Sequence, residues 1–240
     1  MSSLLVRVGA DQSSDGGRWN GPVDGNTGDF VYVPIPEGRP LHHGMGKPYT
    51  SLEAALRRFG QQLPPQLAGR YMHLDPDFEK LTYGDQGERA KQLRACLGPS
   101  DLVVFYASFT DVRSRGTLVY ALIGLLTVDR LAYARDFSET ERDINAHTRR
   151  QLAPGADDIV VIGNRGKSGR LRRCIAVGEW RKGAYRVRED LLEAWGGLSV
   201  RDGWLQRSAR LPRFLDPERF RSWLDAQNPE LIASNNGSEP

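Results

Sequence analysis

The stretch Asp101–Ala107, DLVVFYA, decides the fold together with Leu118–Val128, LVYALIGLLTV. Both runs are rich in apolar, β-branched and aromatic residues, which is typical of buried strands. The polar link between them, Thr110–Thr117, suits a hairpin. We therefore expect two buried antiparallel strands here, and the rest of the sheet to assemble beside them.

The flanking sequence mixes further strands with helices, without a regular strand–helix–strand rhythm. Apolar patterning predicts strands at 4–8, 30–35, 158–163 and 171–177. Capping boxes, Thr50 with Glu53 and Ser138 with Glu141, predict helices at 50–59 and 138–151. Other helices are expected at 86–97, 189–195 and 216–227. The predicted class is α+β: a mixed, mainly antiparallel curved sheet or partial barrel with flanking helices. We expect a single domain over residues 1–232 and a disordered tail at 233–240.

Composition indicates an ordinary globular protein of the cytoplasm. Of 240 residues, 39% are hydrophobic and 26% charged, and the net charge is only +3. The two cysteines, Cys96 and Cys174, have no metal-ligand spacing, which fits a reducing compartment. The first apolar run is too short for a signal peptide, and no run approaches the length of a membrane span. We therefore expect no membrane partner.

Charge is unevenly distributed along the chain. Five acids and three bases lie between Arg70 and Ala90, whereas nine Lys or Arg residues and one acid lie between Ile159 and Arg188. An acidic and a basic region together are the minimum needed to hold a phosphate and do chemistry beside it.

The acidic region centres on Tyr71–Asp85, YMHLDPDFEKLTYGD. Its polar residues alternate, so an extended chain would turn them to one side. The oxygen ligands Asp75, Asp77 and Glu79 predict a site for Mg²⁺ or Mn²⁺. The predicted catalytic residues are His73, Asp77, Tyr83 and Asp85. A second interpretation stays open: Asp75-Pro76 resembles Asp216-Pro217, so Asp75 is also a candidate helix N-cap.

A basic turn follows the predicted strand at 158–163. The turn, GNRGKSGR at 163–170, resembles a phosphate loop, but Val161 stands where the P-loop needs glycine. A Gly-rich turn with cations still suits an anion. Its candidate ligands are Asn164, Lys167, Ser168 and Arg170, and a solvated basic hairpin is the alternative.

The loop from Asp11 to Asp24 supplies further candidates. Asp11 directly follows a strand, which would hold it rigidly. Trp19 and Asn20 could stack on a base and hydrogen-bond its edge, although a lone Trp also serves as a plug over a core. His147, expected in mid-helix, is assigned a structural or exposed role.

Six segments in this order resemble the nucleotide-modification-associated domain of the third type, over residues 3–225. They are WNGPVD, FVYVPIPE, HLDPDFEKLTYGD, GPSDLVVFYASF, YALIGLLTV and IVVIGNRGKSGRL. The resemblance implies a place among genes that hypermodify DNA bases in phages and bacteria. It also implies Glu37, Tyr106 and Ser108 as substrate-binding residues. A second likeness, of residues 101–128, is to PUA-like domains of the EVE and ASCH group, which often bind modified bases or RNA.

Three functions fit these observations. The first is an enzyme acting on a nucleotide or modified base, with an acidic and aromatic site next to a phosphate-binding turn. The second is a PUA-like reader, with Trp19, Tyr83 and Tyr106 around a modified base. The third is a structural protein. We favour the enzyme, because clustered carboxylates repel phosphate and help a reader little. The expected partner is a nucleotide or nucleic acid, with DNA favoured over RNA.

Overall fold

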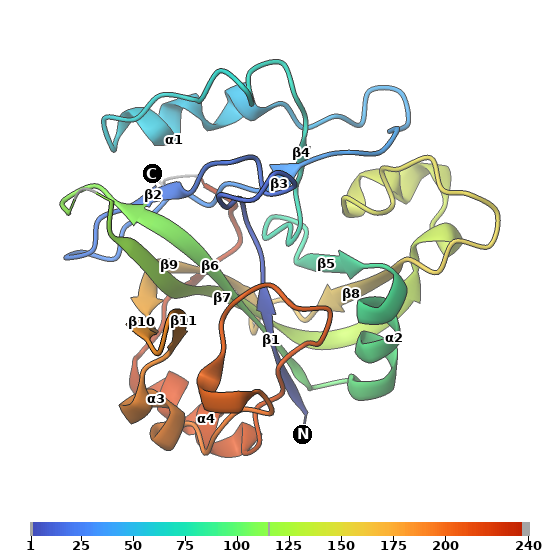
Figure 1. The fold of residues 1–240 in the computed structure, drawn as a ribbon. Coiled ribbons are helices and arrows are strands. Elements are labelled where there is room, and N and C mark those ends of the chain that lie inside the picture. The colour runs from blue at the N-terminus through green and yellow to red at the C-terminus, as the bar shows by residue number, and fades with distance from the viewer. Residues whose placement is uncertain (1, 115, 237–240) are drawn as a thin grey trace.

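The computed structural model describes residues 2–114 and 116–236. Within these residues eight strands form one mixed, mainly antiparallel sheet, with helices around it (Figure 1). The path β1-β6-β7-β8-β5 is extended by β2 beside β6, by β9 beside β7 and by β12 beside β9. The predicted α+β class is confirmed, and the described strands close no barrel. The strands are β1 Ser3–Arg7, β2 Gly21–Val23, β5 Thr82–Asp85, β6 Leu102–Asp111, β7 Leu118–Tyr133, β8 Ile159–Gly163, β9 Gly169–Ala176 and β12 Leu231–Ile232.

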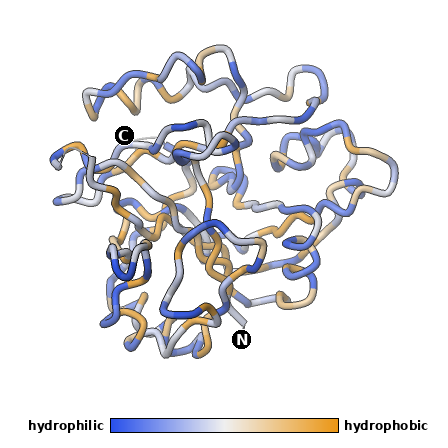
Figure 2. Tube along the Cα trace, in the orientation of Figure 1, coloured by the Kyte–Doolittle hydropathy of each residue, from blue (hydrophilic) through white to orange (hydrophobic). Residues whose placement is uncertain are grey.

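The predicted hairpin at the centre of the sheet is β6–β7. Successive side chains of β6 point to opposite faces: Val103 and Phe105 join one core, whereas Leu102 and Val104 join the other. Both faces are covered, so β6 is buried from Leu102 to Phe109 and β7 from Tyr120 to Val128. Apolar chain segments accordingly gather along the sheet, and the outer loops are hydrophilic (Figure 2).

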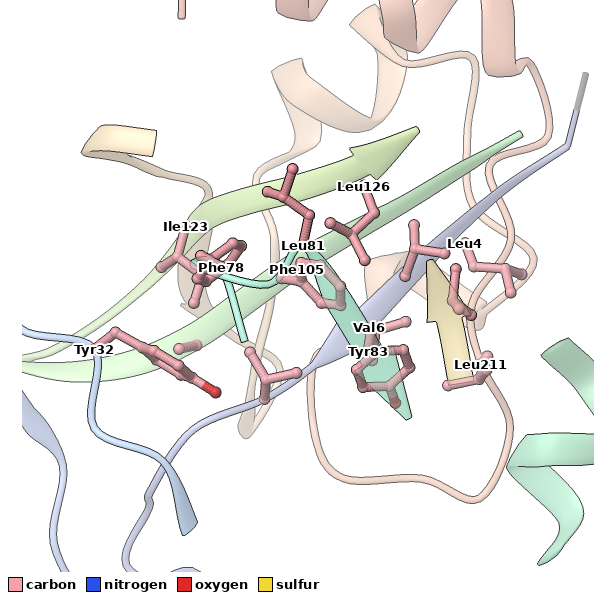
Figure 3. Packing of buried hydrophobic residues seen from close by; sticks show 14 of the residues in the cluster. Leu4, Val6, Tyr32, Phe78, Leu81, Tyr83, Phe105, Ile123, Leu126 and Leu211 are labelled. Carbon is pink, nitrogen blue, oxygen red and sulfur yellow. The ribbon is translucent and has the colours of Figure 1, made fainter. Parts of the chain in front are cut away.

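Helices and short strand pairs cover the sheet. Trp195, directly after α3, and Phe220 of α4 pack in one of the two cores. Tyr83 packs with Val6 and Leu211 in the other (Figure 3). No helix in the described residues has the length and apolar character to cross a membrane. The α-helices are α1 Glu53–Arg57, α2 Gly87–Cys96, α3 Glu189–Ala194 and α4 Pro217–Ala226; 3-10 helices are Tyr49–Leu52, Ala134–Asp136, Glu139–Ile144 and Arg201–Gly203; the short pairs are β3 Ile35–Pro36 with β4 Met72–His73, and β10 Gly178–Arg181 with β11 Ala184–Val187.

The basic turn is a loop within an interrupted strand, not a hairpin. Both β8 and β9 run antiparallel to β7, with Gly163 opposite Val128 and Gly169 opposite Leu125. The backbone N–H of Asn164 donates to the carbonyl of Thr127 at 2.7 Å. The loop between the two strands is therefore anchored on β7.

Several local predictions are wrong. Residues 30–35 form an isolated bridge at Phe30 and the start of β3 rather than one strand. Thr50 caps nothing, since it lies inside a 3-10 helix. The Ser138–Glu141 capping box is present, but its helix is a 3-10 helix that ends at Ile144.

The predicted tail is partly ordered. Asn235 is buried, and its side chain accepts from the N–H of Phe78 at 2.8 Å. Asn236 exchanges hydrogen bonds with the backbone of Tyr32. Asn235 and Asn236 are therefore docked on the fold. The structure describes residues 233–236 of the predicted tail, and residues 237–240 lie outside the described part of the chain.

Candidate functional site

A cavity of about 440 Å³ lies at the end of β1, and residues of β1, β4, β5 and α2 line it. Residues 206–212 form another wall; this segment passes in front of β1, in orange in Figure 1, and Pro212 accepts a hydrogen bond from the N–H of Leu5. Of the residues predicted from the sequence, those lining the cavity are His73, Asp75, Tyr83, Asp85 and Tyr106.

His73, Asp75 and His147 form a buried cluster on the cavity wall. Nε2 of His73 lies 3.9 Å from Oδ2 of Asp75, and Nε2 of His147 lies 3.8 Å from the same oxygen. One potential ligand atom from each residue lies within 4.8 Å of the others. The two imidazoles and the carboxylate thus converge on one point.

A carboxylate stands behind each imidazole. Glu37 Oε2 lies 2.9 Å from Nδ1 of His73, and Asp158 Oδ1 is hydrogen-bonded to Nδ1 of His147. Arg150 donates to Glu37 at 3.0–3.2 Å and lies 4.0 Å from Asp158. Nη2 of Arg150 also lies 3.1 Å from Nδ1 of His73, so Glu37 and Arg150 both contact that nitrogen. In the tautomer whose Nδ1–H donates to the carboxylate, Nε2 carries the lone pair. Both lone pairs then face Asp75.

These contacts shift the pKa values of the acidic groups around the cluster. Burial opposes ionisation of Glu37, but hydrogen bonds from His73 and Arg150 and the charge of Arg150 outweigh it and lower the pKa of Glu37 to about 2. Burial likewise opposes ionisation of Asp158, yet its hydrogen bond and charge interaction with His147 lower its pKa. Burial lowers the pKa of His73 to about 4. The supporting carboxylates are therefore charged at neutral pH, and His73 is neutral.

Asp75 is held through both carboxylate oxygens, since the N–H of Gly84 lies 3.1 Å from Oδ2 as well. Oδ1 accepts from the N–H of Gly84 and from the side-chain amide of Asn145, each at 2.8 Å. Burial raises the pKa of Asp75 to about 7, although the charge of His147 and these hydrogen bonds act in the opposite direction. A buried carboxylate in this position needs either a proton or a nearby cation. The alternative role of Asp75 as a helix N-cap is wrong, because no helix follows it.

Arginine side chains surround the rest of the cavity. Arg7, Arg89, Arg150, Arg207 and Arg210 line it. All but Arg210 pair with an acidic residue, as Arg89 does with Asp85 at 2.8 Å. Arg210 is exposed and forms no ion pair with any residue in the described part of the chain. The arrangement provides cations for an anionic ligand beside a His and carboxylate cluster.

Tyr83 and Asp85 form a second polar group in the cavity. The Tyr83 hydroxyl donates to Oδ2 of Asp85 and accepts from Arg89 at 2.9 Å. Both residues belong to β5, so their side chains share one face of the strand. Because the Tyr83 ring is buried against Phe105, with centroids 5.2 Å apart, only its polar end contributes to the cavity.

Asp11, Asn20 and Ser108 line an adjoining cavity of about 280 Å³, which shares Arg7 and Arg207 with the main one. The Asn20 amide donates to the Ser108 hydroxyl at 2.7 Å and to its carbonyl at 3.1 Å. Both side chains are buried, so their positions are set by this contact.

Asp77 and Glu79 lie away from the main cavity. They line a different one, near α1. Asp77 is 2% exposed; its Oδ2 pairs with Arg149 at 2.7 Å, and its Oδ1 accepts from Asn235 at 3.0 Å. The predicted set Asp75, Asp77 and Glu79 is therefore not brought to one point, because a turn rather than an extended strand follows Asp75.

The predicted phosphate turn also lies outside both cavities. The Ser168 hydroxyl accepts from the N–H of Thr127 at 3.0 Å, and Arg170 is buried, donates to the carbonyl of Ser234 and lies over Phe30. Asn164 is half-buried and Lys167 is exposed. The Ser168 and Arg170 side chains therefore serve the fold.

The predicted aromatic pocket does not form. Trp19 packs against the hydrophobic cluster under α1, not beside the cavity. The Tyr106 hydroxyl donates to the carbonyl of Leu205 at 2.9 Å. No stacked pair of rings is thus presented to a ligand by these residues.

The sequence argument missed the residues that complete the cluster: Asn145, His147, Arg150 and Asp158. All four are buried polar side chains. They lie in a turn and at the start of β8, far in sequence from His73. The local signal in the sequence is the pair of polar residues Asn145 and His147, which lie within the predicted helix at 138–151.

Comparison with known proteins identifies one family. The sequence model described as nucleotide modification associated domain 3 matches residues 3–229. No curated protein and no solved structure matches the chain. The matched region includes every residue of the cavity.

Proposed function

The chain belongs to the family of nucleotide modification associated domain 3, and on that premise we propose that it is an enzyme acting on a nucleotide unit in the main cavity. The unit is a free nucleotide or an unpaired nucleotide of DNA. Its phosphate lies against Arg210 and Arg7, and its reacting group lies over His73, Asp75 and His147. Tyr83 and Asp85 exchange protons with it.

One observation carries this proposal: imidazoles, carboxylates and arginines meet in a single cavity. Catalytic sites gather titratable groups whose pKa values are shifted in a cleft. The volume of about 440 Å³ lies in the range of small-ligand pockets. A base inside a duplex cannot reach such a cavity, so a substrate within DNA has to be unpaired.

A reader is less well supported. Reading a modified base by stacking needs exposed aromatic faces. The rings of Tyr83 and Tyr106 are buried, and Trp19 packs elsewhere. The buried His and carboxylate cluster, by contrast, has no use in stacking.

Binding tests the phosphate site. Deoxynucleoside monophosphates and a short single-stranded DNA are titrated against the wild-type chain and against Arg210→Ala. We expect affinity to fall about tenfold, the equivalent of about 1.4 kcal/mol, and to weaken with salt. The matched control is Arg165→Ala, an exposed arginine of the loop between β8 and β9. An equal loss in both variants would refute the assignment.

Turnover separates an enzyme from a reader. Nucleotide pools and digested DNA from cells that express the wild-type chain are compared by mass spectrometry with those from cells that express Asp75→Asn. We expect a nucleotide of altered mass with the wild-type chain alone. Binding through Arg210 without any altered nucleotide would instead establish a reader.

A further inference from the structure

The two imidazoles of the cluster point at Asp75 without bonding to it. Their Nε2 atoms stand 3.8 and 3.9 Å from Oδ2 of Asp75, whereas an N–H···O hydrogen bond measures about 2.7–3.2 Å. The trio is therefore not held by hydrogen bonds among its members. Other contacts hold each member in this convergent position.

Those contacts are of the kind found behind metal ligands. A metal-binding His almost always donates its second ring nitrogen to a carboxylate or carbonyl, which fixes the ring and its tautomer. His73 and His147 each have such a carboxylate, Glu37 and Asp158. The N–H of Gly84 lies 2.8 Å from Oδ1 of Asp75 and 3.1 Å from Oδ2, and Oδ1 also accepts from Asn145. The remaining lone pair of Oδ2 is turned towards the imidazoles.

The spacing also suits an ion. Bonds of about 2.0–2.2 Å to nitrogen and oxygen place tetrahedral ligands about 3.4 Å apart. The separations of 3.8 and 3.9 Å from Asp75 are close to this value, so small side-chain movements complete the site. The cluster lines the cavity, so coordination positions remain on the open side.

We propose that His73, Asp75 and His147 bind one divalent transition-metal ion through two imidazole nitrogens and one carboxylate oxygen, with its open positions facing the cavity. Two His and one carboxylate suit Zn²⁺ or Fe²⁺ better than Mg²⁺, which prefers oxygen ligands. The inference deepens the proposed function, on which it rests for the substrate but not for the ion.

The ion also accounts for the division of the cavity. Arg210 is an exposed residue of the cavity lining, whereas His73 and Asp75 are buried residues of the same lining. When the substrate phosphate binds Arg210, the rest of the nucleotide unit extends towards the ion. Oxygen or nitrogen atoms of that unit, or a water molecule, take the open positions.

Metal binding is measured without any nucleotide. The full chain is dialysed against a chelator and titrated with Zn²⁺, with Fe²⁺ under anaerobic conditions, and with Mg²⁺, by calorimetry. Co²⁺ replaces these ions in a parallel titration, because its visible absorption reports nitrogen and oxygen ligation. We expect one equivalent of Zn²⁺, Fe²⁺ or Co²⁺ to bind and to raise the melting temperature. Mg²⁺ should have no comparable effect.

Variants locate the ion. His73→Ala and His147→Ala should abolish the Co²⁺ spectrum, whereas His43→Ala, an exposed His outside the main cavity, should keep it. Asp158→Asn should weaken the affinity about 10–100-fold, as loss of a group behind a ligand does. This last variant is nearly isosteric, so it remains informative if a His variant does not fold.

Clear results overturn the inference. The inference fails if the folded wild-type chain binds no transition metal, or if the metal affinity is unchanged in both His variants. It also fails if Mg²⁺ binds as tightly as Zn²⁺. Nucleotide binding through Arg210 is measured separately on the metal-free chain. Loss of the ion site alone therefore leaves the proposed function standing, and loss of nucleotide binding alone leaves the ion site standing.

Discussion

Gly84 lies directly against the imidazole of His147: a Cβ at residue 84 would stand 2.4 Å from Cδ2 of His147. The backbone of Gly84 needs no left-handed conformation, so space alone excludes a side chain there. Its N–H also donates to Asp75. This glycine therefore sets the distance between His147 and Asp75.

Gly84→Ala should displace His147 from the cluster. We expect overpacking to cost about 1–3 kcal/mol of stability and the Co²⁺ spectrum to disappear. Chemical denaturation and metal titration measure the two effects. Gly98→Ala is the control, because a Cβ there meets nothing closer than 4.0 Å. A Gly84→Ala chain that keeps both stability and metal binding would contradict the packing argument.

Asp77→Ala should destabilise the fold rather than act on the main cavity. Asp77 and Arg149 are both 2% exposed and pair at 2.7 Å. Without Asp77, Arg149 keeps only the partly exposed Asp143, at 2.9 Å, as an acidic partner. Breaking a buried ion pair costs about 3–5 kcal/mol. Urea denaturation measures the loss. Glu79→Ala, two residues away and exposed, should change stability little, and equal effects of the two variants would argue against the buried pair.

Asn235→Ala should show that the C-terminal segment is part of the fold. The Asn235 side chain donates to Asp77 and accepts from the N–H of Phe78. Buried groups that lose their partners cost about 1–3 kcal/mol. Thermal and urea unfolding report the change, with Asn26→Ala in an exposed loop as the control. An unchanged midpoint would mean that the segment does not stay docked.

Asp11 should make stability depend on pH in acid. Burial opposes its ionisation, but hydrogen bonds from Ser13 and the charges of Arg207 and Arg7 outweigh it and lower its pKa below 3.8. The unfolded chain then binds more protons in this range. The stabilisation is complete above the unfolded pKa and is lost as pH falls through the folded pKa.

Asp11→Asn tests that dependence. Urea unfolding of the wild-type chain and the variant is compared from neutral pH to about pH 3. The difference in free energy of unfolding should be largest near neutral pH and should shrink in acid. Asp15→Asn, at an exposed position of the same loop, should show no such trend. A constant difference for Asp11→Asn would exclude the ionised carboxylate as its cause.

The strands were predictable where burial is continuous. DLVVFYA and LVYALIGLLTV have a preference for strand that no neighbouring signal opposes, and they form β6 and β7. FVYVPI is equally apolar and just as buried, yet Pro34 and Pro36 have no N–H to donate to a ladder. Its burial was predictable, but its pairing was not.

The predicted helix at 138–151 shows how tertiary contacts override a local signal. Its capping box forms, but the helix ends at Ile144 and Asn145 adopts an extended conformation. The Asn145 side chain donates to Asp75 and accepts from the N–H of His147. These bonds require the chain to leave the helix and bring His147 to the cluster.

The sequence by itself determined the α+β class and the central hairpin, because periodicity and residue type are local properties. For the same reason it singled out His73, Asp75, Tyr83 and Asp85 as candidate site residues. Only the tertiary structure decided that Asp75 faces His147 whereas Asp77 pairs with Arg149. The carboxylates of Asp75 and Asp77, separated by one residue, line different cavities because of the turn between them and their distant partners. No spacing along the chain encodes those partners, since folding brings them together only when the sheet assembles.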